Sequence, residues 1–157
     1  MEDQLKAACA EFQAILKENA PMIASAGYMC FDDFPKGCCE ASTHFLAHYL
    51  VTRGFCQTDE IRMPWNNYDK QEEWGCASHG WIILSNGLNI DISANQFSGI
   101  EDKVIVSRDH EVHRRFVGGE LVSFDEHHRR LTCHDYGESF KRAWEIVTKK
   151  PPPSNGG

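Results

Sequence analysis

The sequence lacks any long run of apolar residues, and its longest apolar stretches span only a few positions. A membrane-spanning helix needs about 20 consecutive, mainly apolar residues, so we expect no membrane partner. The opening segment, MEDQLKAACAEFQAILKENA, also lacks the apolar core of a secretory signal, because charged residues recur throughout it. We therefore expect a cytoplasmic protein.

Basic residues are also in deficit, because 16 Lys and Arg residues face 23 Asp and Glu residues and give a formal net charge of −7. This charge disfavours nucleic acid as a partner. The one basic cluster, His127 to Arg130, directly follows Asp125 and Glu126, and we interpret it as a solvated surface turn. No internal repeat is present, which argues against a solenoid.

The cysteine content indicates free thiols. Seven cysteines in a chain without an export signal fit a reducing compartment better than a disulfide framework. A length of 157 residues with 41% apolar residues is sufficient for one domain with its own hydrophobic core. We place that domain at residues 1–149. Residues 150–157, KPPPSNGG, are too poor in apolar side chains to pack, and we expect a disordered tail.

The N-terminal half is predicted to be helical. Hydrophobic spacing predicts one helix over residues 2–19, which stops before Pro21, and a second over residues 38–53, which ends at Gly54. Residues 57–76 mix charges, a proline and two tryptophans without clear periodicity. We expect a long irregular connection there, of the kind that often shapes a binding site.

The C-terminal half is predicted to begin with strands. Alternating patterns predict a β-hairpin over residues 79–93 and a short strand over 103–107, and helical spacing predicts a closing helix over 136–148. The predicted fold is therefore α+β, with N-terminal helices packed on an antiparallel β-sheet and a C-terminal helix.

The loop length of the hairpin decides which side chains share a face. A two-residue loop at Asn86-Gly87 would scatter polar groups over both faces of the hairpin. A three-residue loop that begins at Ser85 separates them. One face then carries Ile82, Leu84, Leu88, Ile90 and Ile92, and the other carries His79, Trp81, Ile83, Asn89, Asp91 and Ser93. We therefore favour the three-residue loop.

This register places a histidine and an acid together. His79 pairs with Ser93, and Asp91 becomes its diagonal neighbour, roughly 7–8 Å away at the backbone and within reach of an imidazole. Two cysteines, Cys38 and Cys39, open the second predicted helix, where unpaired N–H groups and the helix dipole favour a thiolate. The sequence therefore offers a cysteine, a histidine and an aspartate with the chemistry of a catalytic triad.

Four stretches carry a family resemblance: FPKGCCEAS, SHGWIIL, NIDISANQF and VIVSR, in this order over residues 34–108. With them the chain resembles the papain-like cysteine enzymes, most closely the transglutaminase-like branch. It is also similar to small uncharacterised bacterial proteins with the patterns FPxGxC, HxW and DI-S/T-A-D/N-QF. The resemblance implies one papain-like catalytic domain over residues 1–149. Its GxC spacing selects Cys39 as the nucleophile, with His79 as the base and Asp91 as the orienting acid.

One departure from papain concerns the oxyanion. Papain has a glutamine shortly before its nucleophile, and the corresponding stretch here, CFDDFPKGC, has none. The backbone N–H of Cys39 can supply one donor. A protonated Asp33 or a tryptophan indole are candidates for a second donor, and Gln96 is a candidate for orienting the site. We expect Trp65, Trp74 and Trp81 to line the substrate cleft.

The function implied by the resemblance is a thiol-dependent acyl transfer, most simply the hydrolysis of an amide bond by a peptidase, amidase or glutamine deamidase. The alternatives are transglutaminase-like ligation and a non-catalytic binding module on the same fold. We expect a protein or peptide substrate and no cofactor, and the sequence leaves the oligomeric state open.

A zinc site is the main alternative for the cysteines and histidines. Cys76 and His79 have a ligand-like spacing, which Cys30, Cys38, Cys39 or the pair Cys133-His134 could complete. The second ligand pair is ambiguous, so we expect no metal. His44 and His48 lie one helical turn apart, but no glutamate of a metalloprotease helix stands between them. We interpret both as surface or packing residues.

Overall fold

A computed structural model describes residues 1–75, 77–133 and 136–149 of the chain. The helices of four residues or more are α1 (Glu2–Ser25), α2 (Cys39–Thr52), α3 (Glu111–Arg114), α4 (Phe124–Leu131) and α5 (Tyr136–Thr148). Three short 3₁₀ helices lie at Met29–Asp33, Thr58–Glu60 and Ala94–Gln96. The strands are β1 (Ile61–Trp65), β2 (Tyr68–Asp69), β3 (Ile82–Leu84), β4 (Asn89–Asp91), β5 (Ile105–Ser107), β6 (Phe116–Val117) and β7 (Glu120–Ser123).

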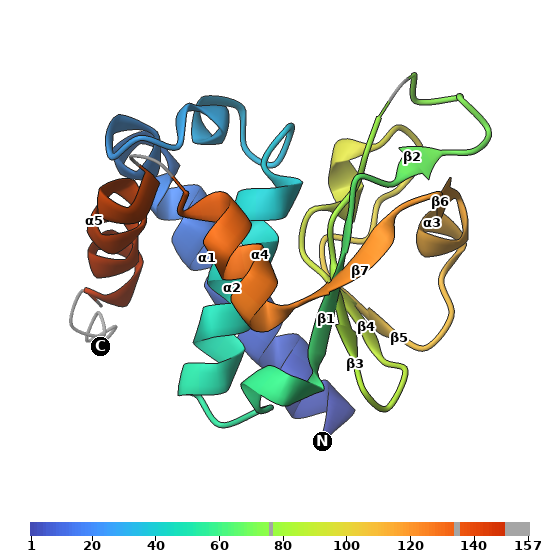
Figure 1. Ribbon diagram of the computed structural model, residues 1–157, viewed down its shortest axis with the longest axis horizontal. Coiled ribbons are helices and arrows are strands. Elements are labelled where there is room, and N and C mark those ends of the chain that lie inside the picture. The colour runs from blue at the N-terminus through green and yellow to red at the C-terminus, as the bar shows by residue number, and fades with distance from the viewer. Residues whose placement is uncertain (76, 134–135, 150–157) are drawn as a thin grey trace, which may run out of the picture.

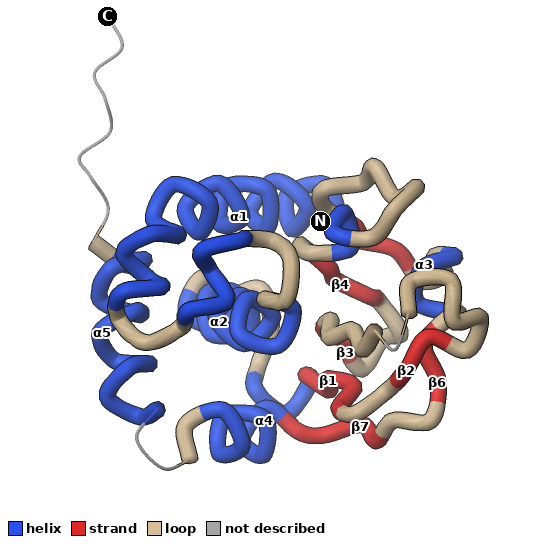
Figure 2. The backbone as a smooth tube through the Cα atoms, turned by 90° about the horizontal axis from the view of Figure 1, so that it is seen from above, coloured by secondary structure: helices blue, strands red, loops and turns tan. Residues whose placement is uncertain are grey.

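Five strands form an antiparallel sheet in the order β5-β4-β3-β1-β7. Figure 1 shows α1, α2, α4 and α5 on one side of this sheet and the β2–β6 ribbon with α3 on the other side. Figure 2 shows the same division from above. The predicted α+β class, with N-terminal helices, an antiparallel sheet and a C-terminal helix, is therefore confirmed.

The predicted hairpin register is also confirmed. Ile82 pairs with Ile90, and the backbone N–H of Leu84 donates to the carbonyl oxygen of Leu88 at 2.9 Å. The loop between them is therefore Ser85-Asn86-Gly87, and Gly87 has φ +86°, a left-handed conformation that favours glycine. The strands are shorter than the predicted range of 79–93, because β3 begins only at Ile82.

Two clusters of buried side chains lie on opposite faces of the sheet. The larger one joins the helices to the apolar face of the hairpin, including Ile82, Leu88, Ile90 and Ile92. The smaller one lies on the other face and contains Trp81, Ala94, Phe97, Ile105, Val112 and Phe116. The face that holds His79 and Asp91 is thus covered by aromatic side chains from later in the chain.

The predicted end of the first helix before Pro21 is wrong, because α1 continues to Ser25. A proline inside a helix removes one backbone hydrogen bond and costs about 3 kcal/mol or more. The last turns compensate by burial, since Ile23 and Ala24 lie in the larger core. Packing therefore outweighs the local penalty. The second helix was predicted at 38–53 and begins and ends within one residue of that range.

The predicted irregular connection at residues 57–76 is wrong in its first half, where Ile61–Trp65 form β1 between β3 and β7. The sequence did not indicate this strand, because a proline is uncommon inside a strand. Pro64 is tolerated because the ladder with β3 covers only Ile61 and Arg62, so Pro64 has β7 alone as its neighbour. Strands β6 and β7 and the short helix α3 were also missed.

The predicted surface turn at His127–Arg130 is wrong. These residues belong to α4, whose N-cap Ser123 accepts a hydrogen bond from the backbone N–H of Glu126. His127 is fully buried, whereas Arg129 and Arg130 pair with Glu126. The closing helix was predicted at residues 136–148 and is found there as α5.

Some expectations fall on residues outside the described part. These are the disordered tail at 150–157 and the roles of Cys76 and His134. Among the described helices, none combines the length and the apolar character that a bilayer crossing requires.

Candidate active site

Cys39 lies at the first position of α2, and Cys38 is the N-cap residue. The side chain of Cys39 is almost buried, with an exposed fraction of 7%. The first turn of a helix has backbone N–H groups without intrahelical partners, and these stabilise negative charge nearby. The predicted placement of a thiol at a helix N-terminus is therefore confirmed for Cys39.

The segment that carries His79 lies against this end of α2. The hydroxyl of Thr43 donates to the carbonyl oxygen of Gly80 at 3.1 Å. A Cβ atom at Gly80 would lie only 3.2–3.3 Å from the carboxyl group of Glu40, which follows Cys39 directly. Gly80 thus lies directly against the first turn of α2, and this contact places His79 beside the start of that helix.

His79 and Asp91 form a buried pair. His79 Nε2–H donates to Asp91 Oδ2 at 2.6 Å, and neither side chain is exposed to solvent. Burial by itself disfavours the charged imidazole. The Asp91 carboxylate and a further side-chain interaction with Cys39 outweigh burial and raise the pKa of His79 to about 10. The predicted shared face of His79 and Asp91 is therefore confirmed.

Asp91 has two further donors that the sequence did not indicate as such. His113 Nε2–H donates to the same Oδ2 atom at 2.7 Å, and the backbone N–H of Ser93 donates to Oδ1 at 2.9 Å. Burial by itself would raise the pKa of Asp91, but His79 and His113 lower it well below the ordinary carboxyl value. The carboxylate is thus held as an anion by three donors.

His113 is the residue of this site that sequence reasoning missed. It lies on α3, a helix of four residues, and stacks on Trp81 with ring centroids 4.5 Å apart. Burial lowers the pKa of His113, although Asp91 opposes the shift, so the ring is neutral near pH 7. With Nε2–H donating to Asp91, its Nδ1 atom is a buried acceptor without a hydrogen-bond partner.

Gln96 connects the cysteine loop to the histidine. Its Oε1 atom accepts a hydrogen bond from the backbone N–H of Gly37 at 3.2 Å. Its Nε2 group donates to the carbonyl oxygen of Ser93 at 3.0 Å and lies 3.5 Å from His79 Nδ1. Because Nε2 of His79 faces Asp91, Nδ1 is the ring nitrogen that points away from the acid, and the Gln96 amide lies beside it.

Cys38 lies in a different environment from Cys39. Its thiol is fully buried and donates to the carbonyl oxygen of Cys30 at 2.8 Å. A side-chain hydrogen bond with Cys30 and burial raise the pKa of Cys38 far above the ordinary thiol value. Cys38 is therefore held as a neutral thiol. The cysteines in the described part, Cys9, Cys30, Cys38, Cys39, Cys56 and Cys133, are all free, as predicted.

Of the three tryptophans expected in the cleft, Trp74 and Trp81 lie with the smaller buried cluster, whereas Trp65 packs against the larger one. Trp65 packs against His127, with ring centroids 5.4 Å apart. Trp81 is almost buried beside His79 and stacks on His113. Trp74 stacks on Phe97, which in turn contacts the His79 ring edge to face at 5.0 Å.

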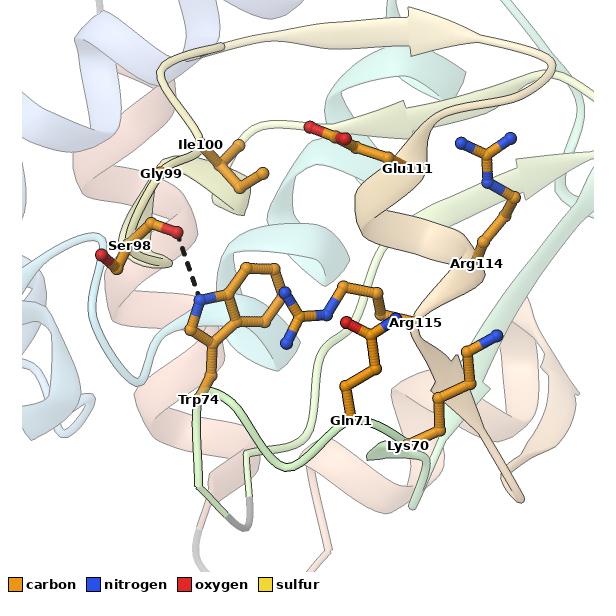
Figure 3. Close-up of a pocket in the computed structure, with 9 residues that line it drawn as sticks. All are labelled: Lys70, Gln71, Trp74, Ser98, Gly99, Ile100, Glu111, Arg114 and Arg115. Atoms are coloured by element: carbon orange, nitrogen blue, oxygen red, sulfur yellow. Dashed lines mark hydrogen bonds between the residues drawn. The ribbon is translucent and has the colours of Figure 1, made fainter.

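Trp74 also lines the cavity drawn in Figure 3, which has a volume of about 410 Å³. Its wall consists of Lys70, Gln71, Trp74, Ser98, Gly99, Ile100, Glu111, Arg114 and Arg115. The indole N–H of Trp74 donates to the carbonyl oxygen of Ser98 at 3.2 Å, and the Arg115 guanidinium lies 3.3 Å from the Trp74 ring. None of the triad candidates lines this cavity.

A second cavity, of about 240 Å³, lies beside the start of α2 and is bordered by Gly37 and Glu40, on either side of the two cysteines. Asp33, the other oxyanion candidate, is exposed. Its negative charge contributes to the raised pKa of the Cys38 thiol.

Two groups of three side chains hold potential metal-ligand atoms close together within the described part of the chain. One consists of His79, Asp91 and His113, and the other of His44, His48 and His128. Neither group contains a cysteine, so the zinc arrangement that the sequence left open for Cys30, Cys38, Cys39 and Cys133 is not assembled among the described residues.

No family model, curated protein or solved structure matches this chain.

Proposed function

We propose that this protein is a thiol-dependent acyl-transfer enzyme that hydrolyses an amide bond. Cys39 attacks the carbonyl carbon, and protonated His79 gives its Nδ1 proton to the departing amine. Asp91 holds the ring orientation and stabilises its positive charge. Water, which gives a proton to the now neutral His79 as it attacks, then hydrolyses the acyl-enzyme and restores the Cys39 thiolate and protonated His79.

The observation that carries this proposal is the buried pair of His79 and Asp91 beside the start of α2, where Cys39 lies. A buried imidazole that hydrogen-bonds an anionic carboxylate through Nε2 has one tautomer and one orientation. Its raised pKa keeps it positively charged near pH 7, and a positive charge next to a thiol favours the thiolate.

Stabilisation of the oxyanion is assigned to two donors. The backbone N–H of Cys39 is one, because it belongs to the first helical turn and has no intrahelical acceptor. The Gln96 amide is the second, because one of its N–H groups donates to Ser93, and protonated His79 Nδ1 cannot accept the other, which is left for an oxyanion. A glutamine that follows the nucleophile in sequence takes the role that papain gives to one that precedes it.

The substrate class follows from the resemblance to papain-like enzymes, and a protein or peptide amide is the natural candidate. Water as the acceptor gives a peptidase, amidase or glutamine deamidase, and an amine acceptor gives transglutaminase-like ligation. The same site geometry serves both acceptors. Hydrolysis comes first because water is always available.

The reactivity of the seven cysteines tests the proposal. The folded protein is treated with a limiting amount of iodoacetamide at pH 7, and the modified peptides are mapped by mass spectrometry. We expect Cys39 to react at least about tenfold faster than every other cysteine. Cys39→Ala should remove the fast reaction, while Cys38→Ala, which changes the neighbouring thiol, should preserve it.

A second probe separates catalysis from binding. p-Nitrophenyl acetate should transfer one acetyl group to Cys39, with a burst of nitrophenolate, and the acetyl group should then be lost by hydrolysis. His79→Ala should abolish the burst. Uniformly slow alkylation of all seven thiols and no burst would instead identify a binding module without catalysis.

A further inference from the structure

Three histidines form a compact cluster between two helices, away from the proposed active site. His44 and His48 lie one turn apart on α2, and His128 lies on α4. His44 has an exposed fraction of only 1%, so of the two places expected for it, surface or packing, it occupies the second. His48 and His128 are partly buried.

The three rings direct one nitrogen each towards a common point. His44 Nε2 lies 2.8 Å from His128 Nδ1 and 3.0 Å from His48 Nε2, and the last two atoms are 3.4 Å apart. Each imidazole nitrogen is either a donor or an acceptor, never both. In a triangle of three such atoms, at least one pair must therefore meet donor to donor or acceptor to acceptor. Hydrogen bonds alone cannot satisfy this arrangement, whereas a cation that accepts three lone pairs can.

A second set of contacts fixes which nitrogen of His44 carries its proton. Glu40 Oε2 accepts a hydrogen bond from His127 Nε2–H at 2.9 Å. His127 Nδ1 then has a lone pair, and it accepts from His44 Nδ1–H at 3.1 Å. The chain from carboxylate to His127 to His44 leaves a lone pair on His44 Nε2, directed into the cluster. Outer partners of this kind orient the histidine ligands of metal sites.

Aromatic side chains enclose the cluster. Phe140 lies within 5.4 Å of all three rings, measured between ring centroids, and Phe124 lies 4.6 Å from His48. Such apolar surroundings disfavour a charged imidazole, and the neutral ring is the form that binds metals.

We propose that His44 Nε2, His48 Nε2 and His128 Nδ1 bind one divalent transition-metal ion, with Zn²⁺ as the ion that fits best. A tetrahedral ion with Zn–N distances of about 2.0–2.1 Å requires nitrogen atoms about 3.3–3.4 Å apart. The widest separation in the cluster already meets this value, and the shortest must open by about 0.5 Å. Water completes the four-coordinate shell. The ion joins α2 to α4.

The group of His79, Asp91 and His113 differs in this respect. Both histidines present an N–H to one carboxylate oxygen, so every contact joins a donor to an acceptor. The nitrogen and oxygen atoms that meet in this group are therefore all paired, and the unpaired His113 Nδ1 atom lies on the other side of its ring. Of these two groups, only the cluster of His44, His48 and His128 has meeting atoms that leave a contact which hydrogen bonds cannot satisfy and a metal ion can.

Metal content measured on the untagged, full-length protein tests the proposal without reference to activity. The protein is stripped with a chelator, incubated with Zn²⁺, desalted and analysed by inductively coupled plasma mass spectrometry. We expect about one Zn²⁺ per chain, a raised Tm, and with Co²⁺ the visible absorption bands of a four-coordinate ion.

Four glutamine variants locate the ion. His48→Gln and His128→Gln each remove one ligand and should weaken Zn²⁺ binding at least about tenfold. His110→Gln, a matched change outside both groups, and His113→Gln should bind Zn²⁺ like the wild type. Far-UV circular dichroism confirms folding, and because His128 is partly exposed on a separate helix, its variant carries the test if His48→Gln unfolds. A wild type that retains no Zn²⁺, or an ion lost in His113→Gln and kept in His128→Gln, would overturn the proposal.

Discussion

The Asp91 carboxylate receives three hydrogen bonds in a place from which solvent is excluded. A charge in such a place is stable only because His79, His113 and the backbone of Ser93 replace its hydration. The same contacts fix the orientation of the His79 ring, as the proposed proton transfer requires. In the proposed mechanism, stability and reactivity therefore depend on one side chain.

Asp91→Asn should affect both properties. The amide keeps one acceptor oxygen but turns an N–H group towards donors, so we expect the free energy of unfolding to fall by about 3–5 kcal/mol. The alkylation rate of Cys39 should also fall, because His79 loses its charge partner. Urea unfolding and peptide mapping measure the two effects. Asp109→Asn, at an exposed aspartate paired with Arg114, should change stability by less than about 1 kcal/mol.

Gln96→Ala separates the oxyanion role from the thiolate. Alkylation by iodoacetamide forms no oxyanion, so its rate at Cys39 should remain within about threefold of the wild type. Acetyl transfer from p-nitrophenyl acetate does form one, and its rate should fall about 10²–10³-fold. Gln71→Ala, at an exposed glutamine, should change neither rate. Equal losses in both reactions would mean that Gln96 acts only by positioning His79.

The residues of the candidate site were predictable to different degrees. His79 and Asp91 share a hairpin, so a local alternation of polar and apolar residues was enough to place them together. His113 could not be found this way. It reaches Asp91 from a four-residue helix that has no periodic signal and that only tertiary packing places there.

At the scale of the elements, a similar contrast separates the hairpin from β1. The hairpin was predictable because one register segregates apolar side chains and the other does not. Strand β1 was not, because the sequence IRMPW contains a charge and a proline. Its assignment depends on the ladder with β7, whose partner residues lie about sixty positions later in the chain.

Gly87 is the position at which the hairpin register can be tested. Its positive φ strains any branched side chain, so Gly87→Val should lower the free energy of unfolding by about 1–3 kcal/mol. No atom lies within 4 Å of the place that a Cβ would occupy, so this cost comes from the backbone alone. Gly87→Asn should cost less, because asparagine tolerates the left-handed region. Equal losses in both variants, measured by urea unfolding, would contradict this explanation.

At the scale of the whole molecule, the two buried clusters on opposite faces of the sheet hold different parts of the candidate site in place. The larger cluster holds α1 and α2 against the sheet, and this fixes the position of Cys39. The smaller cluster buries the rings around His79 and Asp91. The candidate site forms where the start of α2 meets the segment before β3, at Gly80. The position of this contact depends on how the helices pack on the sheet. Single motifs therefore indicated Cys39, His79 and Asp91 but not the residues that surround them.

The pH dependence of unfolding should reveal the charge state of His79. Its pKa rises from an ordinary value of 6.5 to about 10 in the folded protein, so the folded state binds its proton more tightly than the unfolded state. The stabilisation from this proton is fully present below about pH 6.5 and is lost as the pH rises through about 10.

We therefore expect the difference in unfolding free energy between the wild type and His79→Gln to be largest near pH 6.5 and to shrink towards pH 10.5. Taking the difference removes the titration of lysines and tyrosines, which both proteins share. Phe97→Leu, which alters a neutral ring in contact with His79, should give a difference that is the same at every pH. Urea unfolding from pH 6.5 to 10.5 measures all three proteins. A His79→Gln difference that stays constant or grows with pH would show that the imidazole is neutral in the folded protein, and the protonated His79 of the proposed mechanism would then have to be abandoned.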